Sequence, residues 1–264
     1  MTLTLLHGDC LEMMRDLSDN SVDLILCDLP YGCLTRPKIG GGQYIRLPDT
    51  RCAWDVKIDL AKFWAEAKRI LRTDHSPVIH FCTTKFGAEL ISSNPDWFRY
   101  DLVWDKKRGV SFLLANTMPM RSHEMIYVFS KKGAYYNRVD ITGDFGPTQR
   151  GGDRSICYNF IHKKVPKTTV PTSGRRCALS VISVTSFPKG GKHPTEKPSE
   201  LYRWLIERYC PAGGTVLDPT CGSGNSVFTA FDMERHGIGM EMDDGFFKKL
   251  LARLKTVDVI EHVD

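Results

Sequence analysis

The residues with the clearest chemical potential form a short run, Asp28-Leu29-Pro30-Tyr31, directly after the apolar stretch 22–27. A short apolar stretch predicts a buried strand, and ligands of open α/β sheets bind just beyond the carboxyl ends of strands. Asp28 offers a carboxylate, and Leu29 offers a carbonyl whose geometry is restricted because proline follows it. Tyr31 adds an aromatic plate. Two hydrogen-bond acceptors beside an aromatic ring predict a pocket for a planar amino group.

A second run, Asp218 to Asn225, lies between an expected strand and an expected helix. Gly222 and Gly224 allow the backbone to approach a ligand closely, and the start of the helix favours a negative group. Val227 replaces the third glycine of the dinucleotide fingerprint, and there is no Gly-Lys-Ser/Thr of a phosphate-binding loop. Oxidoreductase and nucleoside-triphosphatase functions are therefore disfavoured.

Glu241 follows Gly224 by seventeen residues and ends the next expected strand. A carboxylate at that place can accept hydrogen bonds from both ribose hydroxyls of a nucleoside cofactor. The glycine loop and the acidic strand end together predict a nucleoside ligand.

Apolar runs and helical spacings alternate along the chain, which predicts a parallel sheet covered by helices on both faces. The expected strands are 22–27, 77–82, 102–104, 124–130, 215–217 and 239–241. The expected helices are 60–71, 199–209 and 225–235, and Gly237 closes the last one. No linker separates two self-sufficient cores, so one α/β core with one embedded region is expected.

The embedded region is basic. Residues 138–192 contain ten Lys or Arg against three Asp, which gives +7, whereas the rest of the chain carries −2. The segment is also rich in Gly, Ser, Thr and Pro, with tyrosines among the cations, a mixture that suits a phosphate backbone and some base stacking. A solvated surface insertion is the alternative.

The composition limits the class of protein. With 264 residues, 42% hydrophobic and 25% charged, the chain is typical of one globular domain, with or without an insertion. No uncharged apolar run has the length of a membrane span, and the amino terminus lacks the basic region of a secretion signal. Nine scattered cysteines without a Cys-x-x-Cys pair argue against disulfides and zinc, so a cytoplasmic protein is expected.

Taken together, the motifs resemble those of the S-adenosylmethionine-dependent DNA amino-methyltransferases, the N6-adenine and N4-cytosine family, over most of the chain. Asp28-Leu29-Pro30-Tyr31 resembles the family's Asp-Pro-Pro-Tyr motif, and residues 216–224 (VLDPTCGSG) resemble its cofactor loop. Residues 193–198 (HPTEKP) are similar to its His-Pro-Thr-x-Lys-Pro element, and Gly8-Asp9-Cys10 to its usual opening. The catalytic motif precedes the cofactor motif, as in the circularly permuted beta class.

The resemblance implies a Rossmann-like methyltransferase sheet of seven mostly parallel strands, one of them antiparallel, with an embedded target-recognition insertion. Residues 1–134 would form the catalytic half, 135–192 the insertion and 193–264 the cofactor half. The implied ligands are S-adenosylmethionine, without a metal, and double-stranded DNA, with no membrane. Dimers are frequent in this family, so a homodimer is expected.

The implied reaction is methyl transfer to the exocyclic N6 of an extruded adenine, since Asp rather than Ser opens the catalytic motif. The implied catalytic residues are Asp28, Leu29, Pro30 and Tyr31. The implied cofactor residues are Asp9 for adenine, Lys197 and Asp218 for the methionine part, Glu241 for ribose, and Pro219, Cys221, Gly222, Gly224 and Asn225 in the loop. The candidate DNA-binding residues are Arg150, Arg154, Lys163, Lys164, Lys167, Arg175 and Arg176.

Two positions depart from the family pattern. Leu29 stands where proline is usual, but the role carried over belongs to the backbone carbonyl, which leucine keeps. Thr220 stands where an aromatic residue is common, so a packing contact near the cofactor is expected to be weaker or supplied from elsewhere.

Three alternatives remain open at the level of sequence: transfer to cytosine N4, transfer to an amino group of RNA or protein, and an inactive DNA-binding relative. His80, within an apolar run, is expected to be a satisfied core histidine. Adjacent residues of a strand point to opposite faces, so His123 and Glu124 are not expected to share a metal, and a structural role is favoured.

Overall fold

The computed structural model describes residues 1–30, 56–110, 112–143, 148–152, 165–170, 174–185 and 196–256. It divides into two compact units, one formed by Met1–Asn137 with Ser180–Asp264 and the other by Arg138–Leu179. Four of the predicted site residues, Tyr31, Arg154, Lys163 and Lys164, lie outside the described residues. The side chains of Arg150 and Lys167 also lie outside them.

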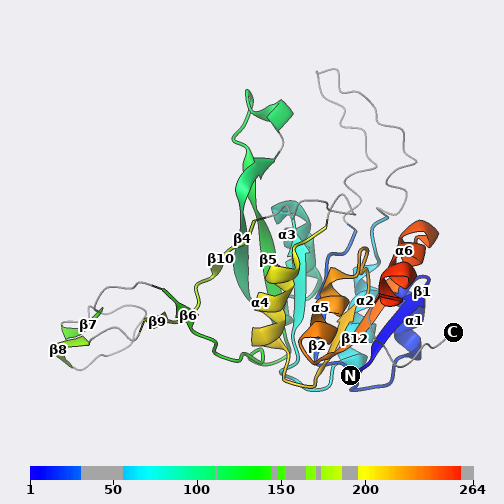
Figure 1. The fold of residues 1–264 in the computed structure, drawn as a ribbon, viewed down its shortest axis with the longest axis horizontal. Coiled ribbons are helices and arrows are strands. Elements are labelled where there is room, and N and C mark those ends of the chain that lie inside the picture. The colour runs from blue at the N-terminus through cyan, green and yellow to red at the C-terminus, as the bar shows by residue number, and fades with distance from the viewer. Residues whose placement is uncertain are drawn as a thin grey trace. The chain divides into compact units, whose positions relative to one another are not determined.

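The first unit is built on one eight-stranded sheet with the order β1-β12-β11-β2-β3-β5-β4-β10 (Figure 1). Its strands are β1 (Leu3–His7), β2 (Leu24–Cys27), β3 (Val78–Cys82), β4 (Phe98–Val110), β5 (Arg121–Phe129), β10 (Val181–Ser183), β11 (Thr215–Asp218) and β12 (His236–Glu241). Only β5 is antiparallel to its neighbours, β3 and β4. The mostly parallel α/β sheet is confirmed.

The expected number of seven strands was wrong, because the segment after the second unit adds one more. Val181–Ser183 pairs in parallel with Val103–Asp105 at the sheet edge. Residues 181–183 therefore belong to the main sheet, although they were predicted to lie in the 135–192 insertion. The second unit ends at Leu179.

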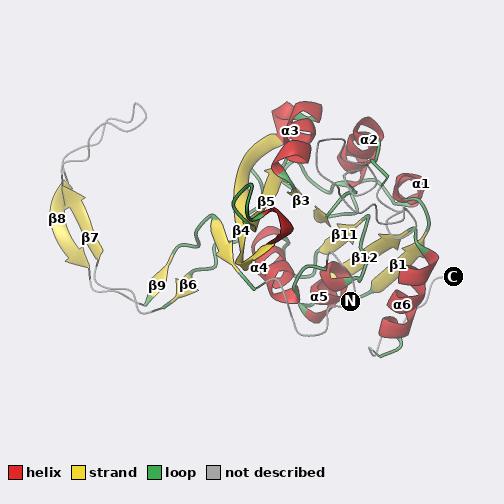
Figure 2. Ribbon diagram, turned by 90° about the horizontal axis from the view of Figure 1, so that it is seen from above, coloured by secondary structure: helices red, strands yellow, loops and turns green. Residues whose placement is uncertain are grey.

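Helices cover both faces of the sheet, as seen from above in Figure 2. Those on one face are α1 (Cys10–Asp16), α2 (Leu60–Ile70) and α3 (Thr84–Ser93), and those on the other are α4 (Ser199–Tyr209), α5 (Asn225–Asp232) and α6 (Asp244–Leu254). In α2, the buried residues Phe63, Trp64, Ala67 and Ile70 follow helical spacing, and Asp59 caps the helix. None of the described helices is long and apolar enough to cross a membrane.

The expected helix 225–235 was too long, and its closing residue was misassigned. Helix α5 ends at Asp232, and Glu234, with a φ of 60°, makes the left-handed turn that was expected of a glycine. Gly237 lies inside β12 instead, where an added Cβ would come within 2.8 Å of the Val227 carbonyl oxygen. This glycine is required by close helix-to-strand packing rather than by a helix end.

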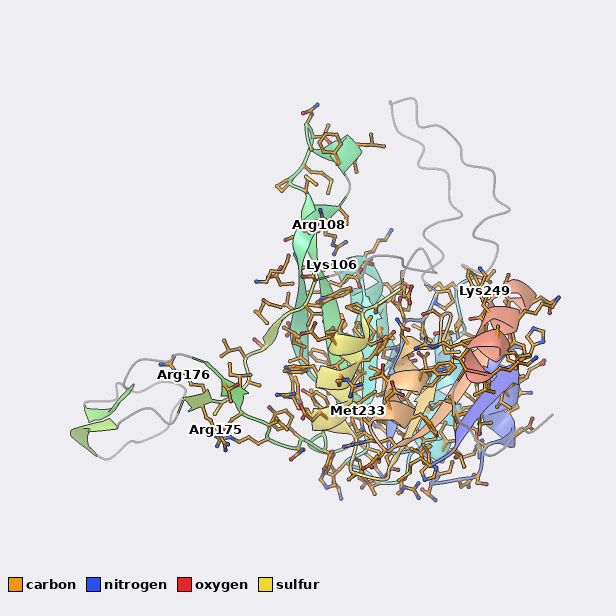
Figure 3. All side chains as sticks on the ribbon, in the orientation of Figure 1. Lys106, Arg108, Arg175, Arg176, Met233 and Lys249 are labelled. Carbon is orange, nitrogen blue, oxygen red and sulfur yellow. The ribbon has the colours of Figure 1, made fainter. Side chains whose placement is uncertain are left out.

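The second unit contains two short antiparallel pairs. Strand β6 (Ile141–Thr142) pairs with β9 (Arg175–Arg176), and β7 (Thr148–Gly152) pairs with β8 (Val165–Val170). Residues 138–179 include eight Lys or Arg against three Asp, so the unit is basic. Arg175 and Arg176, labelled in Figure 3, are exposed.

Candidate active site

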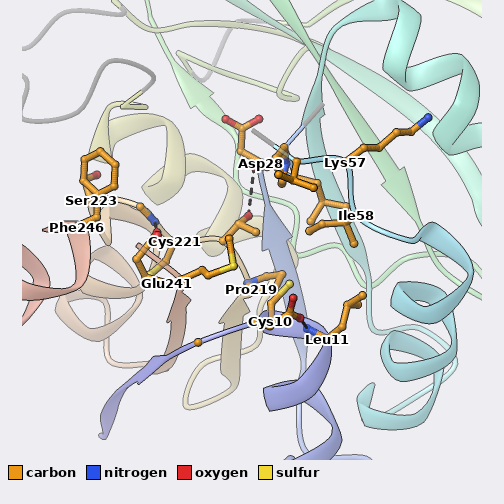
Figure 4. Close-up of a pocket in the computed structure, with 18 of the residues that line it drawn as sticks. Cys10, Leu11, Asp28, Lys57, Ile58, Pro219, Cys221, Ser223, Glu241 and Phe246 are labelled. Atoms are coloured by element: carbon orange, nitrogen blue, oxygen red, sulfur yellow. Dashed lines mark hydrogen bonds between the residues drawn. The ribbon is translucent and has the colours of Figure 1, made fainter. Parts of the chain in front are cut away.

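The carboxyl ends of four parallel strands, β2, β3, β11 and β12, meet at one edge of the sheet. A cavity of about 510 Å³ opens there, and Asp28, Pro219, Cys221 and Glu241 lie on its walls (Figure 4). The two motifs that lie almost two hundred residues apart in sequence thus face one space.

Asp28 is held by a buried lysine. The Lys197 ammonium donates to the Asp28 carboxylate, and its Nζ also lies 3.8 Å from Oε2 of Glu124 on β5. Burial alone would lower the pKa of Lys197, but the charges of Asp28 and Glu124 outweigh burial and raise it. Lys197 is therefore a cation shared by two carboxylates, 5% exposed as a residue.

Glu124 continues this chain of charges outward. Lys106 on β4 forms an ion pair with Oε1 of Glu124 across the two neighbouring strands. Burial would raise the pKa of Glu124, yet Lys197 and Lys106 outweigh burial and lower it. Lys106, Glu124, Lys197 and Asp28 thus alternate in charge from the base of the β4–β5 hairpin to the cavity.

Asp218 lies behind the cavity wall, at the end of β11, and is only 2% exposed. It accepts hydrogen bonds from the Ser226 hydroxyl and from the Thr220 amide, the latter at 3.0 Å. Burial raises the pKa of Asp218 to about 7, although both hydrogen bonds act in the opposite direction. Its carboxyl group therefore titrates near neutral pH.

Glu241 is fixed by backbone amides. Oε2 accepts from the Gly222 amide at 3.0 Å and Oε1 from the Asp243 amide at 2.8 Å. Each oxygen keeps a further lone pair, and the side chain lines the cavity. Burial raises the pKa of Glu241 despite these amides. The arrangement presents an oriented carboxylate to a ligand.

The glycines of the loop have positive φ angles, 54° at Gly222 and 76° at Gly224. An added Cβ on Gly224 would also lie 2.5 Å from a Leu250 methyl group, so any side chain is excluded there. Asn225 then locks the start of α5 by donating to Glu196 at 2.8 Å and to the Lys197 carbonyl at 2.9 Å. The loop therefore has a fixed conformation, and the hydrogen bonds of Asn225 join it to the segment that carries Lys197.

Thr220 connects the two motifs directly. Its hydroxyl donates to the backbone carbonyl of Asp28 at 3.2 Å, the bond drawn below Asp28 in Figure 4. The side chain at the position where the family often has an aromatic residue thus fixes the turn that carries Asp28.

Nine of the predicted site residues line the cavity: Asp9, Asp28, Leu29, Pro30, Lys197, Pro219, Cys221, Gly222 and Glu241. Asp218, Gly224 and Asn225 do not line it and support the loop from behind. Asp9 also caps α1 by accepting from the Leu11 amide at 2.7 Å.

The comparisons with known proteins agree with this geometry. The family model described as DNA methylase, of the N6/N4 type, matches residues 22–252, which is most of the chain. The chain belongs to this DNA methylase family. The type II methyltransferase M.HinfI of Haemophilus influenzae is 26% identical over 96% of this chain and 68% of its own length.

Solved structures share the fold of the methylase. The PvuII DNA methyltransferase, described as cytosine-N4-specific, has a TM-score of 0.65 at 13% identity and covers all of this chain and 89% of its own. The M1.HpyAVI–SAM complex has a TM-score of 0.58 at 17% identity, covering 96% of this chain and 99% of its own. The resemblance found in the motifs is confirmed.

Several lining residues of the methylase were not predicted from the sequence. Ile58 and Lys57 come from the chain before α2, Thr83 follows β3, and Phe246 begins α6. Single side chains of this kind carry no motif, and only the fold brings them to the edge of the sheet. Thr83 could have been found as the residue after an apolar strand.

His80 of the methylase is buried in the core, but it is not fully satisfied. Its Nδ1 lies 3.0 Å from the Cys27 thiol, whereas no partner of Nε2 is found among the described residues. Burial lowers the pKa of His80 to about 3 and raises that of the Cys27 thiol. Within the described ranges, no group of three or more His, Cys, Asp or Glu could hold a metal.

Proposed function

We propose that this methylase transfers a methyl group from S-adenosylmethionine to the exocyclic N6 of adenine in duplex DNA. The observation that carries the proposal is the place of Asp28. It directly follows β2 in the wall of the cavity that Gly222 and Glu241 also line. A carboxylate that can orient an amino group thus shares one space with a nucleoside cradle.

The cavity fits the cofactor. About 510 Å³ lies within the usual range for a ligand of this size, and the wall combines apolar side chains with a few fixed polar groups. Glu241 would bind the ribose hydroxyls and Asp9 the adenine, Lys197 would lie toward the methionine part, and Asp218 would support that side from behind the wall. A solved relative, M1.HpyAVI, is described as a SAM complex, which supports the same ligand.

The amino nitrogen of adenine is a poor nucleophile because its lone pair is delocalised into the ring. Asp28 and the Leu29 carbonyl would each accept one N–H and favour a pyramidal nitrogen with an outward lone pair. The cofactor supplies an electrophilic methyl group on a sulfonium. As the new N–C bond forms and the S–C bond breaks, the Asp28 carboxylate stabilises the positive charge on nitrogen and then accepts its proton.

Lys197 and Glu124 would support Asp28 in this role. The ion pair with Lys197 holds the Asp28 carboxylate in place, and Thr220 holds its backbone. Because Glu124 faces the same ammonium at 3.8 Å, it can retain the charge of Lys197 while Asp28 turns toward an amino group. Leu29 is 1% exposed, so its side chain anchors the turn while its carbonyl serves as acceptor.

The target base would leave the duplex to reach Asp28, with Tyr31 as the stacking partner and the basic second unit on the phosphates. A DNA substrate places the protein with the chromosome in the cytoplasm. Cytosine N4 is the second candidate acceptor, and the similarity to the PvuII methyltransferase, which is described as cytosine-N4-specific, favours it. Asp as the first residue of the catalytic motif favours adenine by family resemblance.

The test is transfer of a labelled methyl group from S-adenosylmethionine to unmethylated duplex DNA, followed by nucleoside digestion and mass analysis. We expect the label on N6-methyladenine. A label on N4-methylcytosine would overturn the choice of base, and a label on RNA or protein but not on DNA would overturn the choice of substrate.

A further inference from the structure

The β4–β5 hairpin extends well beyond the sheet, and its outer part, beyond Lys106 and Glu124, has no role in the site described above. Strand β4 is thirteen residues long, and the pairing of Val110 with Arg121 lies past the last contact of either strand with β3 or β10. Figure 1 shows the hairpin standing clear of the helical layers. A two-stranded extension of this length is marginal alone, which suggests a function for it.

The tip of the hairpin, residues 112–120, exposes large apolar side chains. Phe112 is 76% exposed and Leu113 is 94% exposed, and Met118 and Met120 follow at 49% and 39%. Four such residues within nine positions form an unusual concentration of apolar surface, and surfaces of this kind mark contacts with other molecules.

Hydrogen bonds give the tip a defined shape. Phe112–Leu114 forms a 3₁₀ turn, in which the Ala115 amide donates to the Phe112 carbonyl at 2.9 Å. The Met118 amide donates to the Leu114 carbonyl at 3.0 Å. The side chain of Met120, the last residue of the tip, lies over Gly109 on the stem, where an added Cβ would come within 2.9 Å of it. The exposed apolar side chains are thus attached to a hydrogen-bonded turn of defined conformation.

The charge of the hairpin indicates its partner. Residues 106–121 contain four basic side chains, Lys106, Lys107, Arg108 and Arg121, and no acidic one. Figure 3 shows Lys106 and Arg108 on the stem below the tip. Cations on a stem suit phosphates, and Phe, Leu and Met are the residue types that proteins insert between base steps. A duplex of DNA satisfies both halves of this surface.

The fold aims the hairpin from the catalytic edge. Strand β4 runs in the same direction as β2 and β3, so it leaves the sheet at the edge where Asp28 follows β2. At the base of the hairpin, Lys106 begins the chain of charges that passes through Glu124 and Lys197 to Asp28. A molecule that binds to the tip therefore lies at the same edge of the sheet as Asp28.

We propose that the hairpin tip is a wedge that enters the DNA duplex beside the target base, with Phe112 and Leu113 as its apolar point. The proposal rests on the proposed function, because a base that is methylated at this cavity leaves its stack. Unstacking and unpairing are unfavourable by a few kcal/mol. Apolar contacts made by the wedge in the opened step offset part of that, and the exposed stem cations Lys107 and Arg108 hold the neighbouring phosphates.

The test compares methyl transfer to two duplexes that contain the recognised site, which is first mapped by sequencing methylated DNA. In one duplex the target base is correctly paired, and in the other it is mispaired, which lowers the free energy of extrusion. Phe112→Ala with Leu113→Ala should slow single-turnover transfer to the paired duplex by about tenfold to a hundredfold, and to the mispaired duplex by less than about threefold. Val181→Ala, at an exposed apolar residue of β10, is the control and should change neither rate.

Fluorescence of 2-aminopurine at the target position reports extrusion separately from chemistry. Wild-type protein should raise the fluorescence and the double variant should raise it less, with unchanged binding of S-adenosylmethionine. Equal rates for the variant and the wild type on the paired duplex would overturn the wedge. Equal losses on both duplexes, or a dimer that dissociates in the variant, would also overturn it in favour of a structural or self-association surface. Absence of methyl transfer by the wild type would refute the proposed function instead.

Discussion

Asp218→Asn should raise the free energy of unfolding above that of the wild type, and this gain should be larger at alkaline pH than at acidic pH. The ordinary pKa of this carboxyl is 3.8, and burial raises it to about 7 in the folded protein. Between these values the folded state keeps a proton that the unfolded chain releases, so folding stability falls as pH rises through this window. Above about pH 7 both states are ionised and the full destabilisation, about 4 kcal/mol, is present.

Asn keeps the shape without the charge, because its Oδ1 can still accept from the Thr220 amide and its amide group can donate to the Ser226 hydroxyl. Urea unfolding of both proteins should show the Asn variant gaining about 3 kcal/mol on the wild type between pH 5 and pH 8. Ser226→Ala removes a hydrogen bond that lowers the pKa of Asp218, so its stability should level off at a higher pH. If the free energies of unfolding of Asp218→Asn and the wild type differ by the same amount at pH 5 and at pH 8, the reasoning is refuted.

The remaining predictions concern the contacts around Asp28 and the basic unit. Glu124→Gln should lower the free energy of unfolding, measured by urea titration, by about 3 kcal/mol, because two lysines lose a buried partner. The control is Glu89→Gln, in the exposed pair with Lys57, which should lower the free energy of unfolding by less than about 1 kcal/mol. Thr220→Val should slow methyl transfer by about fivefold, through loss of one hydrogen bond to the Asp28 backbone, without weakening cofactor binding measured by calorimetry. Arg175→Ala with Arg176→Ala should reduce the slope of log affinity for DNA against log salt concentration by about 1 to 2, and an unchanged slope would exclude both from phosphate contact.

The sequence predicted the parts of the fold that follow from local patterns. The fully buried run of β2 and the regular spacing of α2 are visible without tertiary information. The same holds for the cofactor loop, because glycines with positive φ are needed wherever the backbone turns beneath a ligand. These features are encoded within a dozen residues, so they are predictable from the chain alone.

The remaining features depend on contacts between distant segments. The pairing of Lys197 with Asp28 joins residues 169 positions apart, and the hydrogen bond from Thr220 to the Asp28 carbonyl spans 192 positions. Strand β10 was missed because three residues at a sheet edge have no pattern of their own. The position of Glu124 between two lysines is a consequence of strand pairing that no local signal records.

The measurement that tests the central claim most directly is the effect of Asp28→Ala on methyl transfer and on cofactor binding in the same preparation. The variant leaves Lys197 beside Glu124 and leaves the contacts of Glu241 intact. We predict that single-turnover transfer to duplex DNA falls by at least about a hundredfold while the Kd for S-adenosylmethionine changes by less than about threefold. Asp96→Ala, at an exposed carboxylate remote from the cavity, should change neither quantity. Undiminished transfer, or equal losses in transfer and in cofactor binding, would contradict the assignment of Asp28 as the residue that orients the amino group.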